Sequence, residues 1–116
     1  EGFSESLWFE MKAIGVGVKT VSPGGISTDF AGRSLDMADA SSMNEYDDLI
    51  ASMMKMFNDP ERQKNYSTAE QIADVIYEAA TDGKDQLRYV AGGDAKEMYR
   101  QRNELGDQKF MCAQKR

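Results

Sequence analysis

Apolar residues at the start of the chain recur at the spacing of an α-helix. Their stripe predicts an amphipathic helix over residues 1–13. The stripe consists of Phe3, Leu7, Met11 and Ile14. A β-branched run over residues 16–22 then predicts a strand, and Gly15 between the two is expected to cap the helix. Helix, glycine and strand in this order form the αβ half of a βαβ unit.

The central part of the chain is less regular but contains one more helical periodicity. Residues 31–34 are typical of a loop, and apolar residues between 44 and 58 predict a helix. Ser42 and Glu45 have the spacing of a capping box, and an Asp-Pro step at residues 59–60 is expected to end the helix. Five methionines are concentrated here: Met37, Met43, Met53, Met54 and Met56.

The last third of the chain predicts helix, strand and helix. Ser67 and Glu70 have S-x-x-E spacing, so Ser67 is expected to be the N-cap of a helix. The buried face expected for this helix consists of Ile72, Ala73, Ile76 and Ala80, flanked by Val75 and Ala79. Residues 86–91 predict a short strand and residues 94–105 a further helix, whereas the polar tail over 106–116 predicts no element.

Composition narrows the possible functions. The 116 residues fit a single domain, and their formal net charge of −6 argues against a nucleic-acid partner. No apolar run is long enough for a membrane span. The chain has no histidine, which excludes His-based triads and most zinc sites, and no metal site is expected. A single Cys112 indicates a reducing, cytoplasmic setting.

The strongest candidate for a ligand site is the turn after the first predicted strand. That strand ends at Pro23-Gly24-Gly25, where the backbone must turn sharply, and Thr28 follows three residues later. Ligands of open α/β sheets bind outside the carboxyl ends of the strands. From the residues alone, a turn with an incidental threonine is an equally good interpretation.

The helix that begins Glu-Gly-Phe-Ser-Glu-Ser-Leu, together with residues 16–30, closely resembles the second half of a short-chain dehydrogenase/reductase. The resemblance implies an α/β fold: the C-terminal portion of a Rossmann-type doubly wound parallel sheet, ordered helix, strand, helical lid, helix, strand, helix. It implies that the Ile26 amide and the Thr28 hydroxyl contact the nicotinamide carboxamide of NAD or NADP. The cofactor-binding residues would be Pro23, Gly24, Gly25, Ile26 and Thr28. A Tyr…Gly…Asp-Ala pattern also fits the family, with a structural role expected for Tyr89, Gly92, Asp94 and Ala95.

The same resemblance assigns residues 29–66 to a substrate lid. A flexible, unbranched apolar lining would suit a hydrophobic or variable substrate. The resemblance implies that this substrate is a small-molecule carbonyl or alcohol. The expected pocket residues are Phe30, Met53, Met54 and Phe57. The alternative is a surface helix whose methionines only fill gaps in the packing.

Residues that the family needs for chemistry are not in this chain. A Thr-Gly-x-x-x-Gly-x-Gly loop, a substrate-positioning Ser and a Tyr-x-x-x-Lys pair are expected upstream, since no tyrosine here has a lysine four residues later. Residues 1–116 are therefore expected to be the C-terminal fragment of one domain, inactive by itself. The parent would transfer a hydride between NAD(P) and a carbonyl or secondary alcohol.

Two further expectations concern partners and rival functions. In the family the first helix is a common subunit interface, and apolar residues at the edge of its stripe favour a homo-oligomer, dimer or tetramer: Phe3, Trp8 and Phe9. One rival function is a non-enzymatic NAD(P)-binding regulatory protein of the same fold. The other is an independent partner-binding domain.

Overall fold

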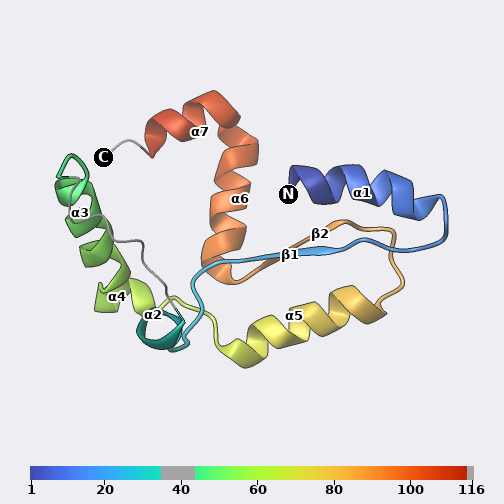
Figure 1. Cartoon of the computed structure of the whole chain (residues 1–116), viewed down its shortest axis with the longest axis horizontal. Coiled ribbons are helices and arrows are strands. Elements are labelled where there is room, and N and C mark those ends of the chain that lie inside the picture. Colours follow the sequence, from blue (N-terminus) through green and yellow to red (C-terminus); the bar gives the residue numbers. More distant parts are fainter. Residues whose placement is uncertain (35–43, 115–116) are drawn as a thin grey trace.

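Two short parallel strands lie at the centre of the chain, with helices around them (Figure 1). The computed structural model describes residues 1–34 and 44–114. Its strands are β1 (Thr20–Pro23) and β2 (Arg88–Ala91). Its helices are α1 (Gly2–Lys12), α2 (Phe30–Arg33), α3 (Asp47–Phe57), α4 (Pro60–Gln63), α5 (Ala69–Thr81), α6 (Gly93–Leu105) and α7 (Asp107–Ala113).

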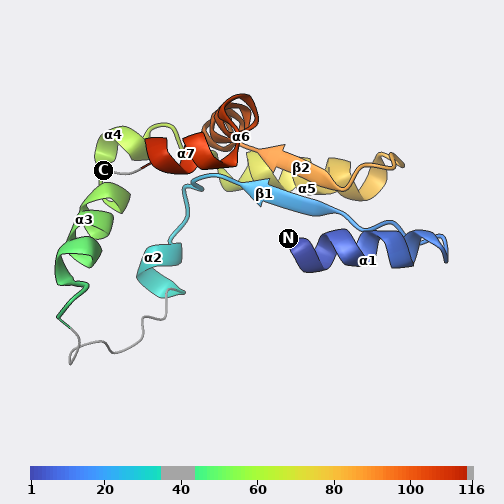
Figure 2. The same cartoon turned by 90° about the horizontal axis from the view of Figure 1, so that it is seen from above.

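The two strands run parallel, in register from Thr20 opposite Arg88 to Pro23 opposite Ala91. Successive strand side chains point to opposite faces. Helices α5 and α1 lie on different sides of the strands (Figures 1 and 2). Tyr89 and Ala91 are buried, and the Tyr89 hydroxyl bonds to Asp82 at the end of α5, whereas Arg88 bonds to Glu5 of α1. This arrangement confirms the predicted α/β class and is compatible with part of a Rossmann-like fold. The remainder of a doubly wound sheet stays a prediction.

Strand β1 begins later than predicted. Residues 16–19 lie outside it, because β2 starts only at Arg88 and gives them no partner within the described parts of the chain. Gly15, with φ of +76°, reverses the chain between α1 and this segment. The predicted element is thus present, but pairing limits it to the four residues that face β2.

Helix α1 forms as predicted, but its apolar stripe is not covered. Phe3 is 80% exposed and Ile14 is 68% exposed, whereas Leu7 and Met11 are half-buried. Arg88 of β2 forms ion pairs with the carboxylates of Glu1 and Glu5, and these pairs link the helix to the sheet. The apolar stripe is therefore only partly buried in this structure, and its two end residues are exposed.

Helix α5 begins one residue later than the S-x-x-E spacing predicted. Thr68 is the N-cap: its hydroxyl accepts from the Gln71 amide, and the Gln71 side chain accepts from the Thr68 amide. The backbone of Ser67 is instead engaged in a bridge to Ile26, which prevents Ser67 from capping the helix.

The buried face of α5 also differs from the expected one. Ile72 and Ala79 are buried and Val75 is half-buried. These positions follow the i, i+3, i+7 spacing of one helix face, and that face packs on the strands. Ile76 is 52% exposed, and Ala73 and Ala80 are exposed as well. The buried face of α5 is therefore rotated around the helix axis, by about one residue position, from the face that the sequence predicted.

The central segment contains two short helices that the sequence did not predict as such. Residues 30–33 form the single turn of α2 where a loop was expected. The predicted stop at residues 59–60 ends α3 and also starts α4, because the Asp59 carboxylate caps the Glu61 amide and proline suits a first helical position. Part of the predicted lid and capping box lies outside the described residues: Met37, Ser42 and Met43.

Helix α7 occupies the tail for which no element was predicted. Its Phe110 is buried, whereas the neighbouring Met111 is 62% exposed. The other buried hydrophobic residues of the described chain are Ile72, Ala79, Tyr89 and Ala91. The radius of gyration is 17.4 Å, against about 13 Å for a compact domain of roughly 100 residues. The described chain is therefore open, with a small core around β2.

In the described ranges, no helix combines the length and the apolar character that crossing a bilayer requires.

Candidate functional site

The predicted Pro-Gly-Gly turn begins at Pro23, the last residue of β1. Pro23 pairs with Ala91, and the Gly24 amide continues the ladder by donating to the Ala91 carbonyl at 3.1 Å. The turn therefore lies at the carboxyl end of the sheet, next to the start of α6 (Figure 1). This is the edge where ligands of parallel sheets bind.

An acidic side chain holds the turn from the first turn of α6. The Gly25 amide donates to Asp94 Oδ2 at 2.8 Å, and Asp94 Oδ1 accepts from the Ala95 amide at 2.9 Å. A Cβ at Gly24 would collide with this carboxylate. The family pattern predicted a structural role for Asp94, and its contacts are made with the turn itself.

An aromatic ring covers the second glycine of the turn. A Cβ at Gly25 would overlap the ring of Tyr66, whose Cγ would lie 2.7 Å away. The two glycines were expected to let the backbone approach a cofactor ring. In the structure the space beside them is occupied by protein groups, Asp94 and Tyr66.

Backbone bonds fix the next part of the turn to the residue before α5. The Ser67 amide donates to the Gly25 carbonyl at 3.0 Å, and the Ser27 amide donates to the Ser67 carbonyl at 2.9 Å. Ile26 and Ser67 therefore form an isolated parallel bridge. Because amides of an extended chain alternate in direction, the Ile26 amide faces away from Ser67.

Two hydrogen-bond donors of the turn have no acceptor among the residues that the structure describes. The amides of Gly24, Gly25, Ser27 and Thr28 donate to protein oxygens, the last to the Ile26 carbonyl at 2.9 Å. Neither the Ile26 amide nor the Thr28 hydroxyl donates to any residue that the structure describes. Ile26 is half-buried and Thr28 is exposed. These are the two groups that the sequence predicted to contact a carboxamide.

A cavity of about 730 Å³ opens beside the turn, on the face of the sheet opposite α5. Pro23, Gly24 and Gly25 of the turn line this cavity, and so does Phe57 of α3. Apolar and aromatic side chains from other elements complete the lining: Tyr66, Val90, Ala95, Met98, Tyr99 and Phe110. No helical period of apolar residues indicated Phe110, because the apolar residues of the tail are confined to one short run.

The structure does not gather all the predicted site residues around this cavity. Ile26 and Thr28 lie outside its lining, and so do three expected pocket residues. Those three are exposed on their helices: Phe30 is 58%, Met53 is 43% and Met54 is 39% exposed. Of the expected pocket residues, only Phe57 lines the cavity.

The end of the cavity nearest α1 is charged. Arg88 donates to Glu5 at 2.7 Å and lies 3.3 Å from Glu1, which also accepts from the Ser22 hydroxyl at 3.0 Å. The hydrogen bond from Ser22 and the charge of Arg88 lower the pKa of Glu1. The Arg88 Nε is buried and has no partner among the described residues. These groups connect α1 to the sheet, and the sequence pattern did not single out Arg88.

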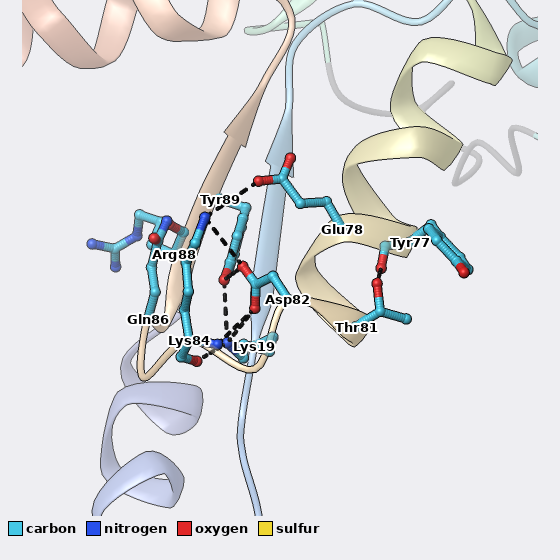
Figure 3. A network of polar contacts seen from close by, with 9 residues as sticks. All are labelled: Lys19, Tyr77, Glu78, Thr81, Asp82, Lys84, Gln86, Arg88 and Tyr89. Carbon is cyan, nitrogen blue, oxygen red and sulfur yellow. Dashed lines mark hydrogen bonds and ion pairs between the residues drawn. The ribbon is translucent and has the colours of Figure 1, made fainter.

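A second polar cluster lies at the opposite, amino-terminal end of the strands (Figure 3). The Tyr89 hydroxyl donates to Asp82 at 2.6 Å, and the Lys19 ammonium lies 3.2 Å from the same hydroxyl. The bond from Tyr89, the Lys84 amide and the charge of Lys19 lower the pKa of Asp82 from 3.8 to about 2. Because Tyr89 is buried on β2 and Asp82 is the C-cap of α5, the bond from Tyr89 to Asp82 joins α5 to the sheet, and Lys19 adds a contact from the residue before β1.

Metal-binding groups are not gathered in the described residues. Within 1–34 and 44–114, no three acidic, cysteine or histidine side chains come together in a group that could hold a metal ion. Cys112 is exposed on α7 and has no disulfide partner, since it is the single cysteine of the chain.

Two known proteins are similar to this chain over its whole length. Both come from Schizosaccharomyces pombe, and both are named uncharacterized oxidoreductases. Each is 33% identical over 121 residues, an alignment that covers 100% of this chain and 47% of the relative. The chain thus spans about half the length of the curated relatives it matches. No family model matches the chain. No solved structure matches it either.

Proposed function

We propose that this chain is the nicotinamide-holding part of an NAD(P)-dependent oxidoreductase of the short-chain dehydrogenase/reductase kind. The names of the two similar yeast proteins support an oxidoreductase. One observation supports the cofactor assignment. In a turn whose other amides donate to protein oxygens, the Ile26 amide and the Thr28 hydroxyl have no acceptor within residues 1–34 and 44–114, and both lie at the carboxyl end of the sheet.

These two groups match the chemistry of a carboxamide. A carboxamide has one carbonyl acceptor and one NH₂ donor, so a fixed backbone N–H and a nearby hydroxyl can hold it in a single orientation. That orientation would present one face of the ring to the substrate. When bound, the nicotinamide would supply the hydride acceptor or donor. Neither Ile26 nor Thr28 distinguishes NAD from NADP, because the extra phosphate of NADP is far from the carboxamide.

The substrate is proposed to be a small carbonyl compound or secondary alcohol held under residues 29–66. Phe57 already lines the cavity beside the turn. Phe30, Met53 and Met54 are exposed on the helices that follow the turn, where closure of α3 would bury them. The acid–base groups and the phosphate-binding loop are proposed to belong to residues of the protein beyond this sequence.

Two further proposals concern assembly and location. The exposed aromatic residues Phe3 and Phe9 on α1, with half-buried Trp8 beside them, are proposed to take part in a homo-oligomer interface, dimer or tetramer. The unpaired Cys112 suits a reducing compartment, and we place the protein in the cytoplasm.

The cofactor assignment is tested by replacing Thr28 with valine, which keeps the side-chain shape and removes the hydroxyl. In the full natural chain that contains these residues, Thr28→Val should weaken NADH or NADPH binding by about three- to tenfold, the effect of one hydrogen bond. Ser27→Ala, which removes a neighbouring exposed hydroxyl, is the matched control and should bind normally. Titration of the reduced cofactors by fluorescence provides the measurement. If the natural chain binds neither NADH nor NADPH, the proposed function is wrong.

A further inference from the structure

We propose that Asp94 is a positioning residue that sets the conformation of the Pro23–Thr28 turn and thereby directs the Ile26 amide toward the ligand. The inference rests on the proposed function, because the amide is assigned to the nicotinamide carboxamide. It adds a residue from a different element, the first turn of α6, to the site.

The backbone at Gly25 can rotate unless neighbouring groups hold it. Glycine adopts positive and negative φ almost equally well, so the two peptide planes that flank it can rotate unless they are held. Asp94 holds the first plane, through the 2.8 Å bond from the Gly25 amide. Ser67 holds the second plane, through the 3.0 Å bond to the Gly25 carbonyl. The second plane also carries the Ile26 amide. Because Asp94 fixes the plane before Gly25 and Ser67 fixes the plane after it, the two bonds together set both backbone torsions of Gly25 and the position from which the Ile26 amide points.

The carboxylate fits tightly against two glycine backbones, on the sides of Gly24 and Gly92. A Cβ at Gly24 would collide with it, and a Cβ at Gly92 would lie 2.9 Å from Asp94 Oδ1. Gly92, with φ of +94°, also adopts a conformation that favours glycine. The carboxylate thus lies among glycine backbones, and each of its two oxygens accepts one amide. This arrangement suits a group that orients the main chain.

The test compares a ligand that contains nicotinamide with one that lacks it. We expect Asp94→Ala in the full natural chain to weaken NADH binding, or NADPH binding if that is the preferred cofactor, by about tenfold. Binding of ADP-ribose, or of its 2′-phosphate for NADPH, should not change, because these molecules have no carboxamide. Asp94→Asn retains one oxygen acceptor and should give an intermediate loss. Asp74→Ala removes the same charge from an exposed position of α5 and is the matched control.

Each outcome has one meaning. A selective loss for the dinucleotide, graded from Asn to Ala, supports the inference. An equal loss for both ligands, with a lower melting temperature for Asp94→Asn as well, would mean that Asp94 only stabilises the fold and would overturn the inference. Unchanged dinucleotide binding in both variants would also overturn it and leave the proposed function standing. If the unsubstituted chain binds the dinucleotide no better than ADP-ribose, the proposed function itself fails.

Discussion

The contact between Gly25 and Tyr66 gives a prediction about stability that needs no ligand. In Gly25→Ala, the new methyl group would lie within 3.0 Å of three ring carbons of Tyr66, closer than real Cβ atoms approach other atoms. The Gly25 backbone is held by its bonds to Asp94 and Ser67, and the contact includes Cγ at the base of the Tyr66 ring, so the ring must leave its present rotamer to make room. Overpacking of this kind costs about 1–3 kcal/mol. We therefore expect the free energy of unfolding to fall by roughly 2 kcal/mol.

Urea unfolding of the full natural chain and its variants measures this loss. Gly17→Ala is the matched control, since the nearest atom to its new methyl group would be the Lys19 Cε at an ordinary 3.9 Å. This control should change stability by less than about 0.5 kcal/mol or stabilise the protein slightly. In a Tyr66→Ala background, Gly25→Ala should add less than about 0.5 kcal/mol to the loss. The reasoning is refuted if Gly25→Ala and Gly17→Ala have the same small effect.

Two other predictions concern α5. Because the pKa of Asp82 is lowered from 3.8 to about 2, its contribution to stability is present above pH 3.8 and is lost as the pH falls toward 2. Tyr89→Phe removes the largest cause of that shift, so the urea midpoint should change less over this pH range than in the natural chain; parallel curves would contradict the assignment. At the other end of the helix, Thr68→Ala should cost about 1 kcal/mol by removing the capping hydroxyl, whereas Ser67→Ala should leave the cap intact. A larger loss of unfolding free energy for Ser67→Ala than for Thr68→Ala would restore Ser67 as the cap.

Local patterns in the sequence predicted most of the elements but not their ends. The spacing of apolar residues was enough to predict α1, α3 and α5, and the β-branched run was enough to predict β1. The ends depend on long-range partners: β1 has four residues because β2 offers four. The α5 cap moved from Ser67 to Thr68 for the same reason, since the bridge to Ile26 is formed by residues that are distant in the sequence.

The candidate site was predictable only in part. Pro23, Gly24 and Gly25 were recognisable as a turn, because glycine and proline have strong local preferences. Asp94 was expected from the family pattern to have a structural role, but its contact with this turn was not predicted. Tyr66 was not singled out at all, since no local pattern indicates which side chain will occupy the space beside a glycine. The pocket residues on α2 and α3 show the opposite case. An apolar period was visible there, but it does not reveal whether the helix face is closed over a cavity or exposed.

The bond between Gly25 and Asp94 joins residues that are 69 positions apart. In an unfolded chain the two ends of such a segment meet rarely, and the entropy of closing the loop must be lost before the contact forms. We therefore expect the turn to form late in folding, after the helices, whose contacts are local. A nascent or partly folded chain would have its helices but not an ordered Ile26 amide. Any ligand that selects this turn would consequently recognise only molecules that have completed the pairing of β1 with β2.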